Sequence, residues 1–246
     1  MERDEYRKMF KQESVYWWYL GLHELVEFYV QSYPSDKPLN ILDAGCGTGR
    51  MIEILNRYGV VTGFERSSIA ISFCAHRGLR NIKSEDLNTW TPQPEMYDII
   101  VSNDVLSDSG IETDLAVAEK YHTALKTGGY LLMNLPAFVW LRRPHDFAVS
   151  TQRRYQKKNI VPYLEKTGFC CRKSSYRLPL LFILILIRKY SIDTFRKKNK
   201  VTSDFIRLPS FLNQCLLSLV RIENRMIESG ISFIFGSSLF LVCEKK

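Results

Sequence analysis

Residues 39–49 read Leu-Asn-Ile-Leu-Asp-Ala-Gly-Cys-Gly-Thr-Gly, and this stretch decides the fold. The apolar pair Ile41-Leu42 is typical of the end of a buried parallel strand, and three alternate glycines predict a turn leaving it. Apolar residues at helical spacing follow, so we expect a helix that ends at Gly59 in a left-handed conformation. A strand, a glycine turn and a helix form the first half of a mononucleotide-binding unit, in which missing Cβ atoms let a ligand approach the backbone. The sequence therefore predicts a ligand site at this turn.

The spacing of the glycines restricts the kind of ligand. A phosphate-binding P-loop needs Gly-x-x-x-x-Gly-Lys-Ser/Thr, which is absent, and the dinucleotide fingerprint needs Gly-x-Gly-x-x-Gly. This loop is instead Gly45-x-Gly47-x-Gly49, with Asp43 two residues before it. An acidic residue beside the loop repels a pyrophosphate and attracts an ammonium group.

The Asp-x-Gly-x-Gly-x-Gly motif resembles the first motif of the class I S-adenosylmethionine-dependent methyltransferases. The resemblance covers Leu39–Gly168 and the last predicted strand. It implies that S-adenosylmethionine is the cofactor, with Asp43 and the glycine turn around its amino-acid end. The insertion at 178–236 looks like a bacterial branch of small-molecule enzymes often linked to cell-envelope and natural-product pathways.

Further cofactor contacts are predicted at the ends of the following strands. Glu65 ends the predicted strand 60–64, twenty residues after Gly45, where a carboxylate can accept both ribose hydroxyls. The resemblance implies that Asp86 reaches the adenine amino group and that Leu87 packs on the ring. The predicted cofactor-binding residues are Asp43, Gly45, Cys46, Gly47, Gly49, Glu65, Arg66, Asp86, Leu87 and Asn103.

The order of strand and helix patterns predicts one α/β domain, residues 1–246, with a doubly wound, Rossmann-like sheet. The resemblance implies seven strands, six parallel and the last, 238–244, antiparallel beside the sixth. Residues 1–36 are expected to form a helical lid, in which 3–31 reads as helical, and 178–236 a helical cap. Within the cap, 209–228 is predicted to be an amphipathic helix with one apolar stripe. The stripe consists of Leu212, Leu216, Leu219, Ile222 and Met226.

The net charge of +8 is unevenly distributed. Stretches 142–158 and 188–200 each hold six Lys/Arg and one acid, and the rest of the chain is close to neutral. The apolar run 178–187 between them would be about 15 Å long as a helix, against a hydrocarbon core of about 30 Å, so it cannot span a bilayer. This pattern favours an anionic or lipid-like acceptor and contact with an anionic membrane surface, although solvated basic faces remain an alternative.

The cysteines and the N-terminus bear on location and metal binding. Six cysteines show no metal-ligand spacing, so we expect no metal and reduced thiols. The charged start Met-Glu-Arg-Asp-Glu has no secretory apolar core. We therefore expect a cytoplasmic protein whose basic surface can meet the inner face of the membrane.

Residues 137–159 follow the fifth predicted strand at the edge where open parallel sheets bind ligands. His145 is the one histidine in such a loop, and we predict it as the catalytic base for a hydroxyl acceptor. Arg153 and Arg154 are predicted to bind an acidic group of the acceptor. A solvated His145, and arginines paired with local acids, are the alternatives. The predicted substrate-binding residues are Tyr19, Asp146, Arg153, Arg154 and Tyr155.

These patterns predict methyl transfer from S-adenosylmethionine to a small-molecule acceptor, with O-methylation of an amphiphilic or anionic metabolite as the specific expectation. Nucleic acid is disfavoured, because the loop from Asn103 lacks the paired prolines and aromatic of many amino-directed nucleic-acid enzymes. The family often has Glu-His where this chain has Ser107-Asp108, so a base at that position is missing. A second hypothesis is therefore kept: a cofactor-binding protein that is regulatory or catalyses a rearrangement without methyl transfer.

Overall fold

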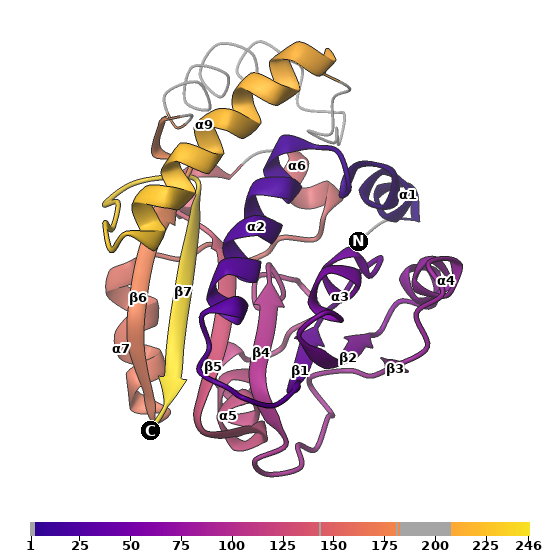
Figure 1. Cartoon of the computed structure of the whole chain (residues 1–246), viewed down its shortest axis with the longest axis vertical. Helices are drawn as coiled ribbons and strands as arrows, with labels where there is room; N and C mark the ends of the chain where they lie inside the picture. Colours follow the sequence, from indigo (N-terminus) through magenta and orange to yellow (C-terminus); the bar gives the residue numbers. More distant parts are fainter. Residues whose placement is uncertain (1–2, 143, 181, 183–207) are drawn as a thin grey trace.

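A computed structural model describes residues 3–142, 144–180, 182 and 208–246 of the 246-residue chain (Figure 1). Its centre is one seven-stranded sheet with the order β3-β2-β1-β4-β5-β7-β6. Six strands run parallel, and β7 is antiparallel to both of its neighbours, β5 and β6, as predicted. The strands are β1 Leu39–Ala44, β2 Gly59–Glu65, β3 Ile82–Ser84, β4 Tyr97–Asn103, β5 Leu125–Pro136, β6 Phe169–Arg177 and β7 Ser238–Lys245.

Helices cover both faces of the sheet, which is the doubly wound arrangement. The described helices are α1 Arg3–Gln12, α2 Trp17–Gln31, α3 Arg50–Leu55, α4 Ser68–His76, α5 Asp114–Ala124, α6 Pro144–Ala148, α7 Lys157–Lys166 and α9 Ser210–Glu228, with a short 3-10 turn at Val139–Leu141. One core layer packs α5 and α7 against the sheet, and the other packs α2, α3 and the C-terminal end of α9.

The alternation of side chains along the strands supplies both core layers. Ile41 and Ile99 contribute to the layer under α2 and α3, whereas their neighbours Leu42 and Ile100 contribute to the layer under α5. All four side chains are fully buried. Strands that are covered on both faces need apolar residues at successive positions, which is why these segments read as continuous apolar runs.

Two details of these elements differ from the sequence prediction. The predicted helical segment 3–31 consists of two helices, with a turn between Gln12 and Trp17. Gly59 begins β2 without a left-handed conformation. A Cβ at Gly59 would lie 2.0 Å from the carbonyl oxygen of Leu39, so glycine is needed there because β1 and β2 approach closely.

The predicted apolar stripe of α9 does not coincide with its buried face. Leu212, Leu219 and Ile222 are 43%, 37% and 49% exposed, whereas Leu217, Val220 and Ile227 are buried. The buried face also contains Asn224, whose Nδ2 donates to Gly21 O of α2 at 2.7 Å. A hydrophobic pattern cannot reveal this face, because a buried polar contact is part of it.

The predicted cap is described in part. The apolar run 178–187 is described at residues 178–180 and 182, while the rest of it and the basic stretch 188–200 lie outside the described residues. Within the described part of the chain, no helix combines the length and apolar character needed to cross a membrane.

The two-layer core leads to a stability prediction. Ile99→Ala should lower the free energy of unfolding by about 2–5 kcal/mol, because it leaves a cavity on a central strand with no solvent exposure. Urea unfolding followed by circular dichroism measures the change. Val60→Ala is the matched control: Val60 is 60% exposed on β2, and its loss should cost less than about 1 kcal/mol. Equal effects of the two changes would contradict this account of the core.

Candidate functional site

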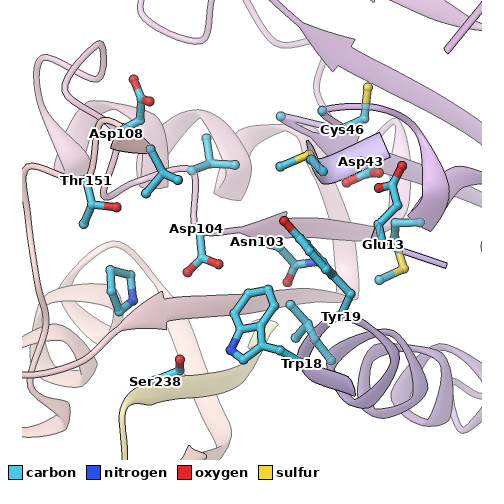
Figure 2. Close-up of a pocket in the computed structure, with 18 of the residues that line it drawn as sticks. Glu13, Trp18, Tyr19, Asp43, Cys46, Asn103, Asp104, Asp108, Thr151 and Ser238 are labelled. Carbon is cyan, nitrogen blue, oxygen red and sulfur yellow. The ribbon is translucent and has the colours of Figure 1, made fainter. Parts of the chain in front are cut away.

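A cavity of about 540 Å³ lies at the carboxyl ends of the parallel strands, and residues of α1, α2 and α6 also line it (Figure 2). Two regions of its wall are distinguished. The glycine-loop side comprises Asp43, Gly45, Cys46, Gly47, Glu65, Arg66, Asp86, Leu87, Asn103 and Asp108. The α6 side comprises Tyr19, Asp104, Leu141, His145, Asp146, Thr151, Arg154, Leu178 and Ser238. One continuous space therefore joins the motif residues to the loop after β5.

The glycine loop has a backbone that only glycine adopts without strain. Gly45, Gly47 and Gly49 have φ values of 79°, 54° and 88°. A Cβ at Gly45 would lie 2.4 Å from Val105 Cγ2. Gly49 was predicted to bind the cofactor, but it lies outside the cavity lining; it is the N-cap of α3, and a Cβ there would lie 2.5 Å from Leu79 Cδ1.

Glu65 ties this loop to the start of α4. Its carboxylate accepts hydrogen bonds from the backbone N–H of Gly47 at 3.0 Å and of Ser67 at 2.8 Å. Burial raises the pKa of Glu65, and these N–H groups oppose the rise. Ser67 also caps α4, as predicted, by accepting from Ala70 N. The carboxylate is therefore held at the cavity wall from two sides.

Two buried polar atoms on the glycine-loop side have no hydrogen-bond partner among the described residues. They are Asp43 Oδ2 and Asn103 Oδ1. Burial, with the charges of Glu65 and Glu13, raises the pKa of Asp43 to about 7. Buried hydrogen-bond acceptors normally have a donor. Two buried acceptors without a donor at one cavity wall therefore indicate where a ligand that donates hydrogen bonds would lie.

A second set of contacts shapes the far end of the glycine-loop side. Asp86 Oδ1 accepts from Asn88 N and Nδ2 at 2.9 and 2.8 Å, and Asn88 Nδ2 also donates to Gly110 O. Arg66 donates to Asp108 Oδ1 at 2.8 Å. Asp108, the second residue of the Ser107-Asp108 pair, is therefore a partner of a predicted cofactor residue.

The N-terminal segment closes the glycine-loop side. Tyr6, Met9 and Glu13 line the cavity, and none of them was singled out from the sequence. Glu13 accepts a hydrogen bond from Thr48 of the loop and forms a 2.7 Å ion pair with Arg77 of the segment after α4. Both charged side chains are at most 10% exposed. This buried pair anchors the turn between α1 and α2 to the glycine loop.

On the α6 side, the predicted arginines are engaged by aspartates. Arg154 donates to both carboxylate oxygens of Asp146, at 2.9 and 2.7 Å, and to Ala137 O at 2.7 Å. Their side chains are 6% and 5% exposed. Arg153 lies outside the cavity lining and pairs with Asp114 at 3.1 Å.

Tyr155 is also outside the cavity lining. Its hydroxyl oxygen lies 2.8 Å from Leu106 O and 2.7 Å from Asp114 Oδ2. Arg153 and Tyr155, both predicted to bind substrate, thus hold the loop after β5 to α5 and to the segment after β4. The alternative considered from the sequence, that Arg153 and Arg154 pair with nearby acidic residues, therefore agrees with their ion pairs to Asp114 and Asp146.

The remaining predicted residues of this region line the cavity. His145 is half-buried on α6, and Tyr19 stands beside Trp18 on α2. His23, one turn further along α2, is buried and lines the cavity as well. Burial, with the charges of Arg50 and Arg177, lowers the pKa of His23 to about 3, so it is neutral at physiological pH.

Comparisons with known proteins find a matching family model, related sequences and similar folds. A family model for a methyltransferase domain matches residues 35–168, more than half of the chain. The trans-aconitate 2-methyltransferase of Agrobacterium fabrum is 33% identical over 107 residues, which is 42% of this chain and 41% of that enzyme. The chain therefore matches less than half of the length of this curated relative.

Two solved structures share the fold. An S-adenosylmethionine-dependent methyltransferase from Mesorhizobium loti has a TM-score of 0.58 and 13% identity, covering 88% of this chain and 96% of that one. A [4+2]-cyclase has a TM-score of 0.53 and 16% identity, covering 89% and 80%. At these identities the likeness concerns the fold alone.

The buried ion pair on the α6 side gives a stability prediction. Arg154→Ala should lower the free energy of unfolding by about 3–5 kcal/mol, because it removes the arginine that donates to both oxygens of the buried Asp146 carboxylate. Thermal and urea unfolding measure the loss. Arg221→Ala breaks a pair with Glu24 that is 50% and 37% exposed, and should cost at most about 1 kcal/mol. A loss at Arg154 as small as this control would show that the pair does not hold the loop.

Proposed function

This chain belongs to the methyltransferase-domain family, and we propose that it transfers a methyl group from S-adenosylmethionine to a small-molecule acceptor. The observation that carries the proposal is the single cavity that joins the glycine loop to the α6 side. Such a space suits two ligands that must meet: a methyl donor on the motif residues and an acceptor beyond them.

The glycine-loop side offers suitable chemistry for the donor. Asp43, with its orphan oxygen, would bind the ammonium group, and the open backbone of Gly45 and Gly47 would lie against the amino-acid part. Glu65 would accept from the ribose hydroxyls; a carboxylate has about four acceptor positions, of which two backbone N–H groups use two. Asp86 and Leu87 would bind the adenine, with Arg66 and Cys46 completing the wall and Asn103 near the reacting end.

The bound cofactor supplies an activated methyl group, so the protein mainly has to align the acceptor and exclude water. The N-terminal segment serves that purpose, because Tyr6, Met9 and Glu13 cover the glycine-loop side. The Glu13–Arg77 pair keeps this cover attached to the loop.

We propose an acceptor that has an apolar part and is methylated on oxygen. Apolar side chains of α2 and of the segments around α6 and α9, among them Trp17, Trp18, Leu141, Leu178 and Leu216, line the acceptor region. The two arginines predicted to recognise an acidic group are each paired with an aspartate, so they do not support an anionic acceptor. Peripheral contact with a membrane remains a prediction from the basic stretches of the sequence.

The second hypothesis, a cofactor-binding protein without methyl transfer, makes a different prediction about products. The cyclase of similar fold shows that this architecture also occurs in a protein with another named activity. Methyl transfer must release S-adenosylhomocysteine when an acceptor is present, whereas a rearrangement or a regulatory role does not. We favour methyl transfer because the family model that matches residues 35–168 is that of a methyltransferase domain.

Cofactor binding is tested by calorimetric titration with S-adenosylmethionine. Glu65→Ala should weaken binding by about 10- to 100-fold, since a hydrogen bond to a charged group contributes about 1.5–3 kcal/mol. Glu119→Ala, which removes an exposed carboxylate on α5, is the matched control and should bind like the wild type. Folded wild-type protein that does not bind the cofactor, or equal affinity of the Glu65 variant, would refute the assignment.

A further inference from the structure

Asp104 is an acidic residue of the cavity that the site prediction did not use. It directly follows β4 and has a φ of 59°, a left-handed conformation that is uncommon outside glycine. Figure 2 shows its carboxylate pointing into the space bordered by Trp18, Tyr19 and Ser238. Left-handed residues cluster at functional sites, where surrounding contacts hold them in place.

A chain of hydrogen bonds holds Asp104 in this position. The side chain of Asn134, on β5, donates from Nδ2 to Asp104 Oδ1 at 3.0 Å. The backbone carbonyl of Asn134 accepts a hydrogen bond from Asp104 N at 2.8 Å. Arg177 of β6 in turn donates to Asn134 Oδ1 at 3.1 Å. Asn134 and Arg177 are at most 1% exposed. Asp104 Oδ2 has no hydrogen-bond donor among the described residues, so one carboxylate oxygen is oriented and the other faces the cavity.

Burial and the charged groups around Asp104 together set its pKa. Burial raises its pKa to about 7, while Arg177 of β6, the bond from Asn134 and Arg154 oppose the rise. Asp146 of α6 raises the pKa further, and Tyr19 of α2 also faces Asp104. A base is most effective when its pKa lies near the working pH, so this environment suits proton transfer.

Resting on the proposed methyl transfer, we propose that Asp104 is the catalytic base that takes the proton of a hydroxyl acceptor, and that Asn134 and Arg177 are its positioning residues. A lone pair of the acceptor oxygen forms the new bond to the methyl carbon. The carbon–sulfur bond breaks, and its electron pair stays on sulfur, which becomes a neutral thioether. The hydroxyl proton passes to Asp104 Oδ2 and then to solvent.

This assignment replaces His145 as the proton acceptor and narrows the acceptor class. Asp104 stands at the end of a central strand next to Asn103, whereas His145 lies on a five-residue helix after β5. The hydrogen bonds that Asp104 forms with the side chain and the backbone carbonyl of Asn134 hold it in one orientation, as a catalytic base requires. A neutral hydroxyl can donate to the Asp104 carboxylate, whereas a carboxylate acceptor would be repelled by it and would need no base.

The test measures S-adenosylhomocysteine release from S-adenosylmethionine with a panel of phenols, aliphatic alcohols, amines and carboxylic acids. Wild-type kcat should rise with pH through an inflection at or below about 7 for hydroxyl acceptors, because Asp104 must lose its proton first and the sulfonium favours its ionised form. Asp104→Asn should lower kcat by about 10²- to 10⁴-fold and remove the inflection. Asparagine adopts the left-handed conformation readily, so the backbone of this variant should be preserved.

Three further variants separate a catalytic role from a structural one. Asn134→Leu should move the inflection to higher pH, because the ionised Asp104 loses its hydrogen-bond donor. His145→Ala should keep the inflection. Asp98→Asn, at the opposite end of β4, removes a carboxylate paired with Lys126 and should leave both kcat and the pH profile unchanged. Unfolding midpoints are recorded for every variant.

Binding measurements separate failure of this proposal from failure of the proposed function. If folded wild-type protein does not bind S-adenosylhomocysteine, the proposed function is rejected. We expect Asp104→Asn to bind S-adenosylhomocysteine with an affinity within about threefold of the wild-type value, because Asp104 acts on the acceptor.

If no panel compound turns over, phenol and benzoate are titrated into protein saturated with S-adenosylhomocysteine. Wild type should prefer phenol, and Asp104→Asn should lose that preference. An unchanged pH profile in Asp104→Asn, turnover of carboxylates alone, or equal probe preference in both proteins would overturn the assignment.

Discussion

The attachment of the glycine loop to β2 is the constraint on which the rest of the site depends. Gly45 N and Cys46 N both donate to Phe64 O, at 2.8 and 2.9 Å, and Gly47 N donates to Glu65. These bonds are possible because the loop adopts left-handed conformations that side chains disfavour. The loop therefore ends β1, starts α3 and presents its backbone to the cavity in a few residues.

Burial of acidic groups is the second organising feature. Asp43, Glu65 and Asp104 all have raised pKa values because the cavity wall shields them from water. A sulfonium or ammonium group placed among them would favour their ionised forms. The electrostatics of the cavity thus suit a cationic methyl donor, and the site is preorganised for that charge before any ligand enters.

Basic residues of the loop after β5 have a structural part in this arrangement. Read along the sequence, Arg153 and Arg154 form a cationic patch; in the fold, Arg153 pairs with Asp114 of α5 and Arg154 with Asp146 of α6. Arg177 is likewise buried and acts on the cavity through Asn134. These three arginines therefore act on the protein's own side chains, and the proposed acceptor region is bordered mainly by apolar side chains and Asp104.

Apart from the antiparallel last strand, which the family resemblance implied, the sequence by itself determined the doubly wound sheet and the positions of Asp43, Glu65 and Asp86 at strand ends. These follow from local patterns, since strand periodicity and glycine spacing depend on neighbouring residues alone. Only the tertiary structure decided that Asp104 faces the cavity, that Glu13 reaches Thr48, and that α9 buries Asn224. The contacts of Glu13 and Asn224 join residues 35 and 203 positions apart in the chain, and the direction of Asp104 depends on its left-handed backbone. Composition and periodicity describe neither long-range contacts nor the backbone conformation of a single residue.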